Sequence, residues 1–327
     1  MNIRRLLRIL FASLLLLVAV LYISHVIPDI DLEIFFLLSW EKWLSVLSLF
    51  LIVQLLTVAY FYLILTRMCN ISSLAKLFQV LFASYSFNYA GPLKLGIPMR
   101  VFLFKRVLGI PYAAGIATVM ATTGLDVLVI IILVFALAGW IYISPLAGLI
   151  LGSATVFALL GLSALFHKLP YTRPKRPKWL ANFLSDLSNL SPFTIFLAIV
   201  ISTIRFLLIS LSCWFVLLGL GEATSLAELI FVYFSSHLAG LLSFIPMGIG
   251  IKDASLIELL SRMGISPAVG IGFVAIDRFI WCLIPLLIGL VAGWHLGVSK
   301  LIKSAKKDTE TDRLNSTETG RSLIRPY

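Results

Sequence analysis

Long apolar runs recur along this chain, and they constrain its fold more than any other feature of the sequence. A run of more than about 18 apolar residues is long enough to cross a bilayer as a helix. Only 13% of the 327 residues are charged, whereas about a quarter are charged in soluble domains. The sequence therefore predicts an all-α polytopic membrane protein.

We expect six full spans in a single membrane domain, residues 1–300, followed by a polar cytoplasmic tail, residues 301–327, that we expect to be disordered. The first run is too long for a signal-peptide core, so we interpret it as a retained span. Trp40, Trp43 and the segment from Tyr60 to Tyr62 are expected to anchor the second span at the membrane interfaces. The expected spans are Leu6–Ile27, Trp43–Leu65, Tyr112–Leu137, the run after Pro145 that ends at Phe166, Phe193–Leu218 and Ile265–Leu296.

The formal net charge of +11 follows the membrane topology and does not indicate nucleic-acid binding. Basic residues gather before the first span, in the loop from His167 to Leu190 and at the start of the tail, whereas the loop after the first span carries Asp29, Asp31 and Glu33. Cytoplasmic loops of membrane proteins are enriched in Lys and Arg. We therefore expect an inner-membrane protein with both termini in the cytoplasm.

Two similar segments interrupt the apolar runs, with Pro92 and Gly96 in the first corresponding to Pro246 and Gly250 in the second. Proline and glycine break helices, and broken backbone inside a membrane is tolerated only where protein or water satisfies its polar groups. Paired interruptions in two halves of a membrane protein indicate a transporter binding site. The predicted helix-break residues are Pro92, Gly96, Pro246, Gly248 and Gly250.

The charges around the first break predict a re-entrant hairpin. If Leu74–Tyr89 crossed the membrane fully, Arg100, Lys105 and Arg106 would face outside, against the positive-inside rule. A hairpin that enters and leaves on the cytoplasmic side removes this conflict. Because three full spans separate the two breaks, we expect an inverted internal repeat, with the second hairpin, in Ala227–Arg262, opening to the outside.

Ionisable residues inside spans are costly and are functional candidates by default. Arg205 lies about twelve residues into its span, where it either lines a site or forms a structural pair with Asp126 or Asp277. Cations beside a helix break, together with free N–H groups at a helix start, form an anion pocket. The predicted substrate-binding residues are Arg205, Lys252, Lys94, Arg100 and Asn88; the predicted counter-ion or proton-coupling residues are Asp126, Asp253, Asp277, Arg278 and Glu258.

At these positions the chain resembles the flippase-like family named for the transmembrane region of lysylphosphatidylglycerol synthase. Its late motif, Pro-Gly-Gly-x-Gly-x-Arg/Lys-acid, is matched from Pro246 to Asp253, with Met247 in place of a usual glycine. Its early motif is matched by Pro92, Gly96 and Arg100, but Ile97 stands where many members have an acid. Members fused to a soluble aminoacyl-transfer domain make and translocate lysyl-lipid. The resemblance implies translocation alone here, since the sequence ends soon after the last span.

The sequence thus predicts a non-enzymatic transporter for an anionic lipid, of phospholipid or polyprenyl-phosphate type. One alternative is a lipid-linked glycosyltransferase that uses Asp29 and Asp31, and another is an accessory protein that binds a lipid-synthesis enzyme. We expect no cofactor. The chain has no ATP-binding loop of the form GxxxxGK[ST], so transport must use an ion gradient or a partner, or else be facilitated. We also expect no metal site, since its three cysteines are isolated.

Overall fold

The computed structural model of this chain describes residues 34–69, 71, 73–90, 95–155, 190–243, 248 and 250–298. These residues form helices and no strand, which confirms the predicted all-α class. The long helices are α3 (Trp40–Leu65), α6 (Tyr112–Tyr142), α9 (Pro192–Gly219) and the continuous α12 (Pro267–Arg278), η4 (Phe279–Leu283) and α13 (Ile284–His295). The shorter helices are α2 (Ile34–Leu37), α4 (Leu74–Ala90), α5 (Gly96–Leu108), α10 (Leu226–Leu242), α11 (Ile251–Arg262) and a segment at Pro145–Thr155.

Among the described residues, four helices are long and apolar enough to cross a membrane: α3, α6, α9 and the one from Pro267 to His295. Their 26 to 31 residues correspond to about 39–46 Å of helix, compared with about 30 Å for the hydrocarbon core of a bilayer. The chain is therefore a multi-pass helical membrane protein. The first expected span, Asp29, Asp31, most of the run that ends at Phe166 and the tail lie outside the described residues.

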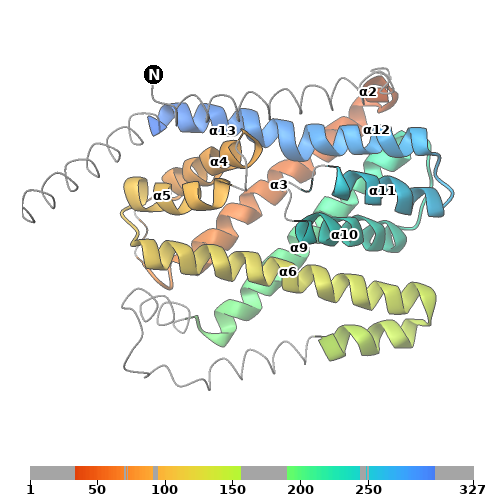
Figure 1. Ribbon diagram of the computed structural model, residues 1–327, viewed down its shortest axis with the longest axis horizontal. Helices are drawn as coiled ribbons and strands as arrows, with labels where there is room; N and C mark the ends of the chain where they lie inside the picture. The colour runs from red at the N-terminus through yellow and green to blue at the C-terminus, as the bar shows by residue number, and fades with distance from the viewer. Residues whose placement is uncertain are drawn as a thin grey trace, which may run out of the picture.

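Two pairs of short helices lie at opposite ends of the long ones (Figure 1). α4 and α5 contain 17 and 13 residues, and α10 and α11 contain 17 and 12. At 1.5 Å per residue none of these helices exceeds about 26 Å. The helix interruptions fall where the sequence predicts them, between Ala90 and Gly96 and between Leu242 and Ile251.

Each short pair packs against long helices. α4 packs mainly against α13, at the far end of the chain, and α10 packs against α6. α3 and α9 pack against each other between the two pairs. The contact of α4 with α13 is close: a Cβ on Gly289 would overlap the carbonyl oxygen of Phe82. Small residues allow such close approach of membrane helices.

The buried side chains divide into two clusters, one around each short pair. The first includes Tyr60, Phe82 and Phe104 from α3, α4 and α5. The second includes Phe234 and Phe273, from α10 and α12. α3, α6 and α9 contribute to both clusters, so these three helices connect the two halves of the molecule.

Candidate functional site

The second helix break depends on two glycines with positive φ. Gly248 has φ 62° and Gly250 has φ 84° with ψ −56°, backbone angles that favour glycine. A Cβ on Gly248 would lie 2.8 Å from the Cα of Gly240, so this turn packs directly on α10. The backbone N–H of Gly250 donates to Asp253 Oδ2 at 3.1 Å, which satisfies one free donor at the start of α11.

Directly after this break, two ion pairs join α11 to α12. Lys252 Nζ lies 3.0 Å from Asp277 Oδ2, and the side chains are only 8% and 2% exposed. Arg278 Nη2 lies 2.7 Å from Asp253 Oδ1. The Tyr233 hydroxyl of α10 donates to Asp277 Oδ1 at 3.0 Å. The adjacent residues Lys252 and Asp253 of α11 are therefore paired with the adjacent residues Asp277 and Arg278 of α12, each with the residue of opposite charge.

A third ion pair connects α9 to α6 and α3. Arg205 Nη1 lies 3.2 Å from Asp126 Oδ1, and its Nε donates to Thr57 Oγ1 at 3.1 Å. Ser202 donates to the same Asp126 oxygen at 2.5 Å. Asp126 is the partner of Arg205, whereas Asp277, the other predicted partner, pairs with Lys252. The Asp126 side chain is 27% exposed, so this pair is the more accessible of the two.

Arg100, near the start of α5, is buried against α3 and α4. Its Nε donates to Ser84 Oγ at 3.0 Å. Its guanidinium carbon lies 4.9 Å from the ring centre of Phe61 and 5.3 Å from that of Tyr85. A cation over an aromatic face gains roughly 0.5–2 kcal/mol, more where water is excluded.

A row of five aromatic rings connects these cations across the two halves. Arg205 lies over Tyr60 and Phe206, with centroid distances of 5.1 and 5.7 Å. Lys252 Nζ lies 4.6 Å from the Tyr233 ring centre. Neighbouring rings within each half are 5.1 to 6.1 Å apart. In order, the aromatic row consists of Phe61, Tyr60, Phe206, Phe234 and Tyr233.

The structure thus brings seven of the predicted site residues into contact with the aromatic row or with the ion pairs beside it. They are Arg100, Asp126, Arg205, Lys252, Asp253, Asp277 and Arg278. Glu258 lies elsewhere, in an exposed pair with Arg262 whose side chains are 62% and 74% exposed. Gly96 begins α5. Lys94, Pro92 and Pro246 lie outside the described residues, as does the side chain of Asn88 at the end of α4.

Sequence reasoning missed the part of α3 at the centre of this site. Tyr60 and Phe61 were expected at the membrane interface, but they are 0% and 5% exposed and lie between Arg205 and Arg100. The Tyr60 hydroxyl donates to the carbonyl of Thr122 at 3.0 Å. The available signal was Thr57, a polar residue three positions before Tyr60 and therefore on the same helix face.

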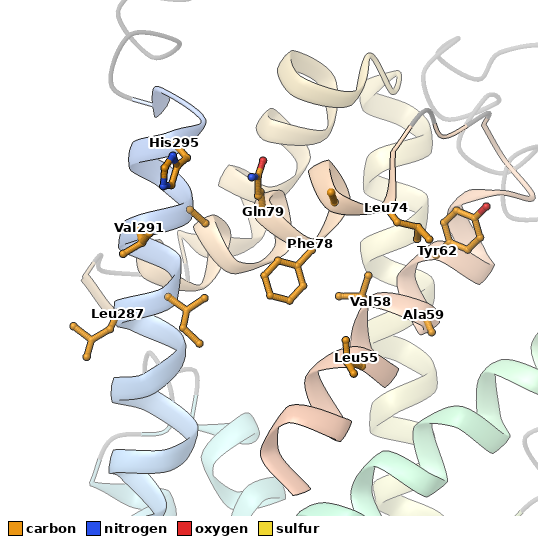
Figure 2. Close-up of a pocket in the computed structure, with 13 residues that line it drawn as sticks. Leu55, Val58, Ala59, Tyr62, Leu74, Phe78, Gln79, Leu287, Val291 and His295 are labelled. Carbon is orange, nitrogen blue, oxygen red and sulfur yellow. The ribbon is translucent and has the colours of Figure 1, made fainter. Parts of the chain in front are cut away.

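The opposite face of this α3 segment borders a groove of about 930 Å³ between α3, α4 and α13. Figure 2 shows Leu287, Val291 and His295 along one side, Val58 on the other side, and Phe78 between them. The lining is apolar except for Tyr62, Gln79 and His295. Among the described residues, no group of three or more metal-binding side chains is present.

Residues 5–289 match the family model described as the lysylphosphatidylglycerol synthase transmembrane region. The chain belongs to this family. The matched region contains every charged residue of the site, from Arg100 to Arg278. A "UPF0104 membrane protein" of Methanocaldococcus jannaschii is 28% identical over 111 residues, which are 34% of this chain and 33% of that protein. The chain thus matches about a third of this relative's length.

Proposed function

We propose that this protein moves a lipid with an anionic head group across the membrane, and that it is a transporter, not an enzyme. The observation that carries this proposal is the set of buried cations beside helix breaks, with Arg100 after the first and Lys252 after the second. Helix N-termini offer free N–H groups and a positive dipole end, which together with cations favour a phosphate. The name of the family refers to a phospholipid, which supports a lipid as the cargo.

The proposed architecture has six spans and two re-entrant hairpins related by an inverted repeat. The matching lengths of the α4–α5 and α10–α11 pairs and their location at opposite ends of the long helices (Figure 1) support it. In both halves a glycine with positive φ, Gly109 or Gly264, follows the second short helix, and a proline then starts a long one. Such repeats place a binding site near the midplane with access from either side.

In this mechanism the lipid phosphate replaces a carboxylate as the partner of a buried cation. Arg205 is the first candidate, because its pair with Asp126 is the more accessible one. A buried ion pair is close to break-even in free energy, since desolvation offsets the attraction. Exchange of one anion for another keeps Arg205 paired, while the released Asp126, whose side chain is 27% exposed, keeps its hydrogen bond from the Ser202 hydroxyl. Asp126 restores the pair when the lipid leaves.

We also propose that the protein lies in the inner (cytoplasmic) membrane, with its α4–α5 end facing the cytoplasm. Arg67, Lys76, Lys105 and Arg106 lie in the helices or helix ends of this half, whereas Glu222 belongs to the connection between α9 and α10. This distribution agrees with the positive-inside rule. Labelling of single cysteines at positions 76 and 222 by an impermeant reagent in intact cells tests it, and labelling of position 76 alone would contradict it.

Lipid exchange in proteoliposomes tests the transport function. Wild-type protein should expose tail-labelled anionic lipid to an external head-group reagent faster than empty liposomes do. The double variant Arg205→Ala with Asp126→Ala removes the cation without leaving a lone carboxylate, and its rate should fall by more than about tenfold. Arg262→Ala, at the exposed pair with Glu258, is the matched control and should retain the wild-type rate. An equal rate in the double variant would refute the role of Arg205.

A further inference from the structure

The groove between α3, α4 and α13 has about the length needed to hold the acyl chains of a lipid in one leaflet of the bilayer. Each helix contributes residues that repeat with helical spacing: Leu55, Val58, Ala59 and Tyr62 from α3, and Leu287, Val291 and His295 from α13. From Leu287 to His295 the groove extends over nine residues, or about 12 Å along the helix axis. Half of a hydrocarbon core is about 15 Å, so the groove reaches most of the way to the midplane.

The polar residues of the groove lie toward one end, close to the C-terminal end of α13. Gln79 and His295 occupy the upper edge in Figure 2, and Leu55 and Leu287 lie toward the opposite end. His295 is in the last turn of α13. Lys76, in the first turn of α4, is exposed one residue after the lining residue Ala75. An apolar groove with Gln79 and His295 at one end, and the exposed Lys76 nearby on α4, complements a lipid with apolar chains and a phosphate that accepts hydrogen bonds.

We propose that this groove binds the acyl chains of the transported anionic lipid while its head group still lies at the membrane surface beside Lys76 and His295. The inference rests on the proposed function for the identity of the lipid. Contact with the site runs along α4: the Phe78 ring, which lines the groove, is 4.3 Å from that of Phe82, which is 5.7 Å from that of Tyr85. Tyr85 contacts Arg100. The groove is thus the position at which the lipid first binds, and the rings of Phe78, Phe82 and Tyr85 connect it to the buried Arg100.

Site-specific photo-crosslinking in the full-length protein tests this inference. A benzoylphenylalanine at Ala59 samples the groove, and one at Phe196, which is exposed on α9 away from it, samples ordinary surrounding lipid. In vesicles of phosphatidylglycerol and phosphatidylcholine, the ratio of anionic to zwitterionic adducts at Ala59 should exceed that at Phe196 by about fivefold. The double variant Lys76→Gln with His295→Gln should remove most of this preference. Equal ratios at Ala59 and Phe196 would overturn the proposal.

The same measurement identifies other occupants by the mass of the adduct. A crosslink from Ala59 to a peptide of residues 1–33, or to a second copy of the chain, would overturn the proposal by showing that protein fills the groove. The double variant of Arg205 and Asp126 separates this inference from the transport function. This variant should lose transport yet keep the crosslink to anionic lipid at Ala59. Ala59→Trp, which fills the groove, should lower transport and should also lower lipid crosslinking from a photoprobe at Val291. Preferential labelling without transport in the wild type would refute the function alone.

Discussion

The two pairs of short helices hold their cations in different ways. In the second pair, Lys252 and Asp253 are each matched by an oppositely charged residue on the next helix, α12, so the ion pairs close within one half of the molecule. In the first pair, Arg100 contacts Ser84 and the rings of Phe61 and Tyr85.

The two halves also differ in how they use the aspartate on the long helix that follows each short pair. Asp277 lies within the charged cluster of its own half, whereas Asp126 of α6 pairs with Arg205 of α9, the long helix before the second pair. The described contacts of Lys252 and Asp253 are thus directed charge pairs, whereas those of Arg100 include a hydrogen bond and aromatic contacts, which tolerate small displacements.

Removal of Asp277 should give the largest effect. Asp277→Asn leaves Lys252 buried without its carboxylate, and loss of one partner of a buried pair costs about 3–5 kcal/mol. Asp126→Asn should cost clearly less, because the Asp126 side chain is 27% exposed whereas that of Asp277 is 2% exposed. The measurement is the thermal unfolding midpoint of the purified proteins in one detergent. Equal losses would show that the two halves do not differ in the way described.

A double variant sharpens this result. Lys252→Met with Asp277→Leu replaces the ion pair by apolar side chains, a change that is often neutral or stabilising. It should recover most of the stability lost in Asp277→Asn and still fail to transport. Recovered transport would show that the pair serves the fold alone.

Two glycines allow a second comparison, with a smaller expected effect. Gly250 and Gly109 both have positive φ, and a Cβ on either would meet no atom within 4 Å. An alanine at such a position costs about 1–3 kcal/mol of backbone strain, more at Gly250, where ψ is −56°, than at Gly109, where ψ is 7°. Gly250→Ala should slow lipid exchange because it displaces the start of α11 and Lys252. Gly109→Ala should destabilise the protein without this loss.

The sequence was sufficient to predict the helix interruptions, because proline, glycine and charge leave local signals. Glycines in a Pro-x-Gly-x-Gly segment and the adjacent Lys252 and Asp253 could be recognised from their order alone. The pairing of Lys252 with Asp277 and of Asp253 with Arg278 could not be predicted, since it depends on how α12 lies against α11. The aromatic row was missed for the same reason. Tyr60 near the end of an apolar run is typical of an interfacial anchor, and only the tertiary packing of α3 places Tyr60 beside Arg205 and the adjacent Phe61 beside Arg100.

The smallest expected effect concerns the aromatic contacts of Arg100, and it distinguishes the two halves most directly. Arg100→Lys keeps the charge but removes the planar guanidinium that donates to Ser84 and lies over Phe61. Stability should fall by about 1 kcal/mol, and exchange of anionic lipid should slow only a few-fold, because a cation still follows the first break. Lys252→Arg, the reciprocal change, places a larger group in a closed set of ion pairs and should cost more in the same unfolding assay. A larger loss at Arg100 than at Lys252 would reverse the comparison, since it would make the first half the more tightly specified one.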